Sequence, residues 1–580
     1  QSKRVDVGLI LFPYAQDVPE TSNQWSIGID FGTTNSCAYF KENKENPKEL
    51  IFKNRINTPY EPGTDEEEIE EVMQAHKEFV PSREVTVPFM TILRERSYKE
   101  SSVENLPFRS NFIYYVDQVL YAIEDLPDDK RPLKFNLKWD EAEQSRTKVQ
   151  YFVSQVVLQA AVEAAASGVK RENLTFNFSY PEAYNADHLR AFKRITRRAV
   201  NVGLGDEKYK SQEKTGFETE SISSALYFAK GQEIPFTENV VTIDIGGGTS
   251  DLSIWQDTKL LWRNSFRLAG KDVLINHLSN NLTLIKEISG NDDLLLESYK
   301  TLQSIKTNKS KLANGIELLV NSPQFGEAFK NRFDIISGKE KGKELKDLTE
   351  LALSGILYYV SQVLNHLIEN DEFETGKNKS KSLRICLGGK ASTLYKIVFE
   401  DSDDQDGLSK MIEKVTGGIF TSIGIVFTDT PKHEVSYGLL VDKEGATDLD
   451  MTDRSHETVL GEDVIVGKSK AGILSELDAD KKWRVKDISQ LKTFLKYLQA
   501  YSKIPVKLTK KFEGDVEGKI NSELKNGQSR ALDLQKNMQS VEGDDSLAEI
   551  QKTSSIVEPV FIQGLKLVIN EVTSGKLKIK

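Results

Sequence analysis

Residues 240–255, VVTIDIGGGTSDLSIW, decide the fold of this 580-residue chain. Their first half is an apolar run that ends in Asp244, their middle is rich in glycine and threonine, and their second half is apolar again. Two apolar runs joined by a short glycine-containing turn predict a β-hairpin. The hairpin would place Asp244 at the end of a buried strand, directly beside the turn.

The same arrangement occurs earlier in the chain, at residues 25–40, WSIGIDFGTTNSCAYF. There Asp30 ends the first apolar run, and Gly32, Thr33 and Thr34 form the turn. A third strand-plus-glycine signal lies at residues 384–392, RICLGGKAS. One glycine-rich turn is weak evidence, because many such turns only close a hairpin. Two acidic hairpins and a third glycine pair are much harder to obtain by chance.

These residue types suit the binding of phosphate groups. Glycines let backbone N–H groups approach phosphate oxygens closely, and threonine hydroxyls add donors. Aspartates can hold a hydrated divalent cation beside those phosphates. No G-x-x-x-x-G-K-[ST] loop occurs, and the turns lead into strands rather than helices, so a Walker-type loop is excluded. The pattern predicts a phosphate clamp with a metal ion.

The remaining chain alternates between predicted strands and helices, which is typical of an α/β fold. A strand is expected at 174–180, and a long helix-rich stretch separates the second hairpin from the third glycine signal. Beyond about residue 443 the apolar spacing is mainly helical. The predicted helices are 151–168, 187–199, 274–288, 293–308, 345–369, 483–504 and 532–576.

Composition narrows the class of protein. Hydrophobic residues make up 38% and charged residues 28%, which is globular composition, and the net charge of −11 argues against a nucleic-acid partner. The two cysteines exclude a secreted disulfide framework. No window approaches the roughly 20 apolar residues that cross a bilayer, so we expect no membrane span. A cytoplasmic protein fits best.

The three motifs together resemble the actin-like ATPase superfamily, and most closely the nucleotide-binding domain of the 70-kDa heat-shock chaperones. The segments IGIDFGTTNSCAYF and IDIGGGTSDLSI resemble its two phosphate motifs, and ICLGGKAS resembles its adenosine motif. The resemblance covers about residues 25–442 and implies an α/β fold of two ribonuclease-H-like lobes, 25–215 and 216–442. We expect residues 1–24 to be a lead-in that could end an upstream domain, and 443–580 to be a mainly helical accessory domain.

The resemblance also implies roles for individual residues. Asp30 and Asp244 would hold Mg²⁺ through water, while Glu220 and Asp244 place the attacking water. The cofactor would be ATP or ADP. The residues implied to bind its phosphates are Gly32, Thr33, Thr34, Gly246, Gly247, Gly248 and Thr249, and those implied to bind its adenosine are Gly388, Gly389 and Lys306.

One departure from the family concerns a catalytic lysine that touches the γ-phosphate. The family places it in the interval that corresponds to residues 89–140, where no clean counterpart stands out. Arg109 lies at roughly the right place in the order of elements, but an ordinary surface arginine is the simpler interpretation. Without such a cation, ATP turnover would be slow, and the domain would act mainly as a nucleotide-dependent switch.

Three functions share this fold, and similarity of fold alone does not choose among them. The leading hypothesis is a divergent chaperone-like ATPase whose nucleotide state controls a protein client or partner through residues 443–580. An actin-like filament-forming or scaffold ATPase is the alternative. A small-metabolite kinase would need an additional acidic residue as base near a substrate hydroxyl, and no such residue is evident in the sequence.

Overall fold

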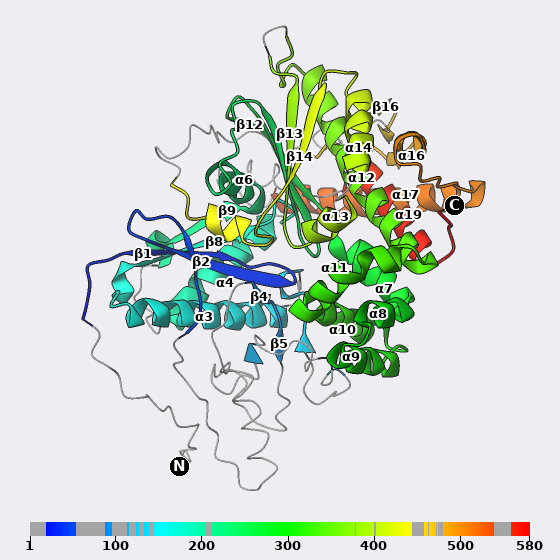
Figure 1. Ribbon diagram of the computed structural model, residues 1–580. Coiled ribbons are helices and arrows are strands. Elements are labelled where there is room, and N and C mark those ends of the chain that lie inside the picture. The colour runs from blue at the N-terminus through cyan, green and yellow to red at the C-terminus, as the bar shows by residue number, and fades with distance from the viewer. Residues whose placement is uncertain are drawn as a thin grey trace.

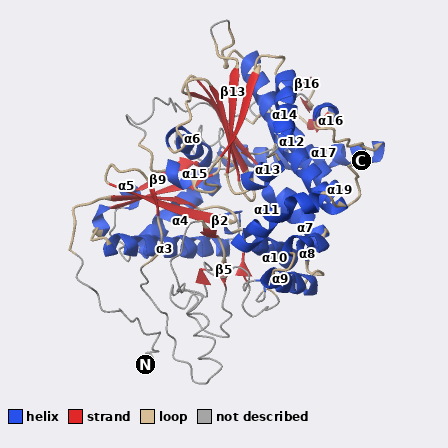
Figure 2. Ribbon diagram, in the orientation of Figure 1, coloured by secondary structure: helices blue, strands red, loops and turns tan. Residues whose placement is uncertain are grey.

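The computed structural model shows a mixed α/β protein with two large sheets (Figures 1 and 2). Its helices cover the outer faces of the sheets, and the C-terminal segment lies against the second of them. The residues that the structure describes are 19–53, 88–94, 113–114, 123, 126, 133–139, 143–184, 186–204, 211–376, 379–399, 402–442, 458–461, 463–470, 472–473, 480–538 and 558–579.

The first sheet has β1 at its centre, the strand that ends in Asp30. Its order is β3-β2-β1-β8-β9, with β1 antiparallel to β2 and parallel to β8. Helices α3 and α4 pack together along this sheet (Figure 1). Strand β4 also pairs with β2. The bounds are β1 Trp25–Asp30, β2 Asn35–Glu42, β3 Lys48–Glu49, β4 Phe89–Met90, β8 Leu174–Tyr180, β9 Thr215–Thr219, α3 Glu143–Ala166, α4 Ala186–Gly203 and α5 Ser211–Lys214.

The second sheet repeats this arrangement of strands. Its order is β12-β11-β10-β13-β14, and its central strand β10 is antiparallel to β11 and parallel to β13. Strand β10 therefore takes the place that β1 takes in the first sheet, and Asp244 near its end corresponds to Asp30. The bounds are β10 Asn239–Ile245, β11 Ser250–Gln256, β12 Lys259–Phe266, β13 Ser382–Gly388 and β14 Ser422–Phe427. Both predicted hairpins are present.

A run of helices connects β12 to β13. The helix predicted at 274–288 is broken into a π-helical turn η3 and the helices α7 and α8, which are interrupted at Asn281 (φ −133°, ψ 57°). The bounds are η3 Lys271–Ile275, α7 Asn276–Asn280, α8 Leu282–Ser289, α9 Asp293–Ser304, α10 Lys309–Asn321, α11 Pro323–Ser337 and α12 Glu340–Glu369, with α13 Ser392–Val398 and α14 Ser402–Val415 after β13.

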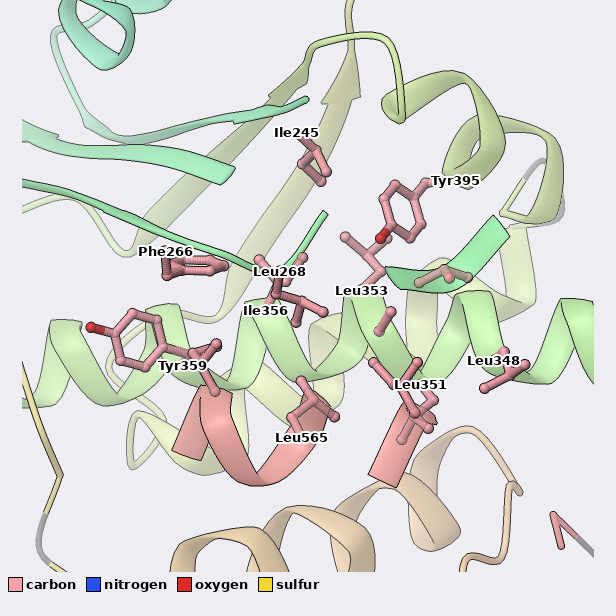
Figure 3. Packing of buried hydrophobic residues seen from close by; sticks show 14 of the residues in the cluster. Ile245, Phe266, Leu268, Leu348, Leu351, Leu353, Ile356, Tyr359, Tyr395 and Leu565 are labelled. Atoms are coloured by element: carbon pink, nitrogen blue, oxygen red, sulfur yellow. The ribbon is translucent and has the colours of Figure 1, made fainter. Parts of the chain in front are cut away.

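Helix α12 is the core helix of the second half. By length and composition it is the one described helix that could cross a membrane, but 78% of its most apolar window is buried inside the protein. Figure 3 shows its side chains, including Leu353 and Ile356, packed between the second sheet and a C-terminal helix. Its apolar character is therefore explained by burial against protein.

Two helices lie between the sheets and bring them together. Helix α6 (Glu220–Lys230) starts directly after β9, where the side chain of Thr219 caps it by accepting from the N–H of Ile222. Helix α15 (Glu434–Gly438) packs against α6 and also against β1 and β2. A Cβ on Gly438 would lie 1.8 Å from the carbonyl oxygen of Ser223, so this close crossing requires glycine. The crossing directs the first residues of both helices toward the space between the sheets.

The C-terminal segment contains helices and a small sheet of order β16-β15-β17. Residues 483–485, predicted as the start of a helical segment, form strand β17 instead, because Trp483 and Val485 alternate as buried residues around exposed Arg484. The predicted domain boundary near residue 443 lies outside the described residues. The bounds are β15 Val464–Val466, β16 Ser469–Lys470, β17 Trp483–Val485, α16 Ser489–Tyr501, α17 Lys510–Met538 and α19 Val560–Thr573.

Helix α19 packs against α12, and its buried side chains belong to the same apolar cluster as the second sheet (Figure 3). Leu565 is fully buried, and an added Cβ on Gly355 of α12 would lie only 2.2 Å from its Cδ2. The C-terminal segment is thus continuous with the core of the second half.

Leu565→Ala should therefore destabilise the protein through the cavity that it leaves, by about 2–5 kcal/mol. Leu294→Ala, at a leucine that is 45% exposed, is the matched control and should cost less than about 1 kcal/mol. Urea unfolding followed by circular dichroism measures both. Equal effects would contradict the shared core.

Candidate functional site

A cavity of about 230 Å³ lies where the central strands of the two sheets end. The polar residues around it come from both sheets and from the helices between them. They include most of the predicted site residues, together with four lysines that the sequence did not single out. The glycines and polar residues of the lining are Gly32, Thr33, Thr34, Asn35, Lys138, Glu220, Asp244, Gly246, Gly247, Thr249, Asp251, Gly270, Lys271, Glu317, Asn321, Ser322, Gly326, Lys390, Thr393 and Lys432.

The two glycine–threonine turns face each other across this cavity. A Cβ on Gly247 would lie 2.3 Å from Thr34 Oγ1, and the nearest atoms to a Cβ on Gly248 belong to Thr33. The buried Thr34 Oγ1 has no hydrogen-bond partner among the described residues, whereas Thr33 Oγ1 accepts from Trp139 Nε1 at 2.9 Å. Glycine is required at 247 because the two turns approach so closely.

Four buried acidic side chains interact with one another at the strand ends: Asp30, Glu220, Asp244 and Asp251, of which the last three line the cavity. Burial raises the pKa of Asp244 and of Asp251 well above the ordinary range, and the neighbouring carboxylates add to the shift. Burial also raises the pKa of Glu220, while the ammonium of Lys138 opposes that rise. Burial thus disfavours the charged forms of these carboxyl groups, while nearby lysines favour them.

Lys138 forms a buried ion pair with Glu220. It lies in a short 3-10 helix, η1 (Leu137–Trp139), which follows strand β7 (Leu133–Lys134) of a small sheet with β5 (Leu93–Arg94) and β6 (Ile113–Tyr114). This is a lysine inside the interval where sequence reasoning found none. The sequence pattern that could have pointed to Lys138 is its position between the apolar residues Leu137 and Trp139. Arg109, which the sequence analysis named in this interval, lies outside the described residues.

Lys432 pairs with Asp30 from the loop before α15. The other carboxylate oxygen of Asp30, Oδ1, accepts from Ser179 Oγ at 2.8 Å. Burial by itself lowers the pKa of Lys432, but Asp30, Asp244 and Glu220 raise it by more, so the side chain stays protonated. Both carboxylate oxygens of Asp30 therefore already have partners from the protein.

This arrangement does not fit the predicted metal ion. Mg²⁺ was expected to be held through water by Asp30 and Asp244, yet the ammonium of Lys432 pairs with one oxygen of Asp30 and Ser179 donates to the other, so an ion here would share this carboxylate with a buried cation. Within the described ranges, no three histidine, cysteine, aspartate or glutamate side chains are grouped as metal ligands. The cation provided by the chain itself is Lys432.

The third glycine segment, Gly388 and Gly389, packs against Asp244 and Glu434. Gly389 has a φ of +81°, which favours glycine, and its N–H donates to Glu434 Oε1 at 3.0 Å. A Cβ at this position would lie 2.2 Å from Asp244 Oδ1. Gly388 and Gly389 thus pack against the acidic cluster, and the next residues, Lys390 and Ala391, line the cavity. Burial raises the pKa of Glu434 to about 7.

The far end of the cavity is apolar, and sequence reasoning missed it. Its residues come from η3, α10, α11 and α13 and from Ala391 just before α13. The apolar residues of these helices have the spacing of any helix that packs in a core, so the sequence does not mark them as a binding site. Lys306, predicted to flank adenosine, is exposed in the turn between α9 and α10 and is not part of the lining. The apolar lining consists of Leu274, Ile275, Val320, Phe325, Phe329, Ala391, Leu394 and Ile397.

Two polar contacts join residues that line the cavity. Asn35 Nδ2, at the start of β2 in the first sheet, donates at 2.8 Å to Asn321 Oδ1 at the end of α10. Lys271 Nζ lies 2.8 Å from Glu317 Oε2. The cavity thus combines a polar lining with glycines and lysines and an apolar lining from the helices that connect β12 to β13.

No family model matches the chain, and a comparison with curated proteins finds no match either. Among solved structures, the chain is similar to the crystal structure of MreB5 of Spiroplasma citri bound to ADP. The identity is 11%, the match covers 72% of this chain and 94% of that chain, and the TM-score is 0.31. The function is accordingly argued from the site and its motifs.

Proposed function

We propose that this cavity binds ATP or ADP, with the phosphates between the two glycine–threonine turns and the base at the apolar end. The observation that carries the proposal is the meeting of Thr34 and Gly247, from turns that follow equivalent strands of two similar sheets. Backbone N–H groups and threonine hydroxyls of both turns can then surround a phosphate chain. Buried lysines on either side supply positive charge.

The proposed fold is the two-lobed actin-like ATPase fold, in which each sheet with its helices is one lobe. The common strand order and strand directions of the two sheets support it. Helix α15 would act as the hinge, because it packs against α6 and also against β1 and β2 of the first sheet.

Hydrolysis of ATP in this cleft would depend on Lys138 and Glu220, which form a buried ion pair beside the cavity. Phosphoryl transfer needs mainly positioning and charge stabilisation, and no covalent nucleophile is required. The ammonium of Lys138 would stabilise negative charge at the terminal phosphate. Glu220, held by Lys138, would accept a hydrogen bond from the attacking water.

The nucleotide state would serve one of two purposes. The motif resemblance favours control of a protein client or partner through the C-terminal segment, in the cytoplasm. The alternative is assembly of copies of this chain into filaments. Both uses require that closing of the cleft around the terminal phosphate changes the angle between the lobes.

Gly247→Val should abolish ATP binding, because the added side chain would occupy the space beside Thr34 Oγ1 that a phosphate needs. We expect an affinity loss of about 100-fold or more in isothermal titration calorimetry. Gly424→Val is the matched control: Gly424 is exposed on strand β14, and nothing lies within 4 Å of its added Cβ. Wild-type protein that binds no ATP, or a Gly247→Val variant that binds normally, would overturn the proposal.

Lys138→Ala should lower the single-turnover rate of ATP hydrolysis by about 100-fold, because the terminal phosphate loses its cation. The rate is measured by release of labelled phosphate. Lys300→Ala, at an exposed lysine on α9, should hydrolyse ATP as the wild type does. An undiminished rate in Lys138→Ala would remove this residue from the chemistry.

Sedimentation separates the two uses of the nucleotide. Control of a partner predicts that the chain stays in the supernatant of a high-speed spin with ATP, with ADP and without nucleotide. Pelleting that depends on ATP would instead favour the filament-forming alternative. The Gly247→Val variant shows whether any pelleting depends on the cleft.

A further inference from the structure

We propose that the ammonium of Lys432 takes the place of a divalent metal ion in this cleft, so that the chain binds nucleotide without Mg²⁺. This inference rests on the proposed nucleotide site and goes beyond it. It arises from the disagreement between the metal ion that the sequence predicts and the side chain that the structure places there.

Lys432 lies beside Asp30, one of the two aspartates at which the metal was expected. Its ammonium pairs with Asp30, which is fully buried, and only 9% of Lys432 itself is exposed. The same lysine is part of the cavity lining together with Asp244 and Glu220. A Cβ on Gly32 would lie 2.8 Å from Lys432 Nζ, so the ammonium touches the first phosphate turn directly. It can therefore reach a phosphate oxygen and Asp30 from one position.

The backbone holds this lysine in place. Lys432 has a φ of +79°, a left-handed conformation that residues other than glycine rarely adopt. The next residue, His433, is fixed on both sides: its N–H donates to the carbonyl oxygen of Thr430 at 3.1 Å, and its Nδ1 lies 2.7 Å from the hydroxyl of Tyr39. An unusual conformation kept by such contacts is typical of functional positions.

The charges around the cleft agree with a cation supplied by the chain. A Mg²⁺ ion bound directly at Asp30 would have to displace the ammonium of Lys432, which would lose its ion pair. Lys138 and Lys432 both line the cavity, and each pairs with a buried acid, Glu220 and Asp30 respectively.

The test compares ADP and ATP affinities of the intact chain in excess EDTA and in excess MgCl₂ by isothermal titration calorimetry. Wild-type affinity should differ by less than about threefold between the two buffers. Lys432→Met should lose about tenfold or more in EDTA and regain affinity with Mg²⁺, since the vacated carboxylates can then accept the ion. Lys300→Met, at an exposed lysine, is the matched control and should behave as the wild type.

A second variant covers the case in which Lys432→Met does not fold because Asp30 is left buried without a partner. Lys432→Met combined with Asp30→Asn removes both charges, and it should bind nucleotide weakly in both buffers with no recovery by Mg²⁺. Recovery by Mg²⁺ in this double variant would count against the inference.

The outcomes for the wild type are separable. An affinity that is about tenfold or more lower in EDTA than in MgCl₂ would overturn the metal-independent site, while the proposal of nucleotide binding would stand. Binding in neither buffer would overturn the proposed function and this inference with it. Equal binding in both buffers, together with a metal requirement in Lys432→Met, supports the inference.

Discussion

Two buried aspartates, Asp30 and Asp244, constrain the structure around the cleft. Each lies at the end of the central strand of its sheet, where the surrounding β-strands remove it from water. An isolated buried carboxylate is costly, so it must be paired or protonated. The structure uses both solutions: Asp30 is paired with Lys432 and hydrogen-bonded to Ser179, whereas Asp244 has a strongly raised pKa.

The pairing of Asp30 with Lys432 also connects distant parts of the chain. Asp30 belongs to the first sheet, while Lys432 comes from the loop between β14 of the second sheet and helix α15. Lys138 and Glu220 form a comparable buried pair between the small sheet's extension and the start of α6. Breaking either pair would leave a buried charge without a partner, so the closed arrangement of the cleft depends on both.

The sequence predicted the hairpins of the cleft and eight of the residues that line it, because a strand that ends in an acid beside a glycine–threonine turn is a local pattern. Asp244, Gly247 and Thr34 were found in this way. Lys138 and Lys432 were not, since each is a single lysine in a loop or short helix, and only the fold brings it to the cavity. The apolar end, with Phe325 and Phe329, was hidden because its spacing is that of any core helix.

The C-terminal segment shows a similar limit. Its helical character was predicted correctly for α16 and α19, and β17 was not, because three residues carry too little periodicity to separate a strand from a helix. That α19 shares a core with α12 depends on contacts between residues about 200 positions apart, such as Gly355 and Leu565. Long-range packing of this kind has no signature in a local pattern.

A crystal structure of the chain with ADP, grown in the presence of Mn²⁺ and measured at the manganese absorption edge, tests the central claim most directly. The account predicts phosphates between the turns at Thr34 and Gly247, the base beside Phe325, Lys432 still paired with Asp30, and no anomalous peak between Asp30 and Asp244. A nucleotide bound elsewhere, or manganese between the two aspartates with Lys432 displaced, would contradict it.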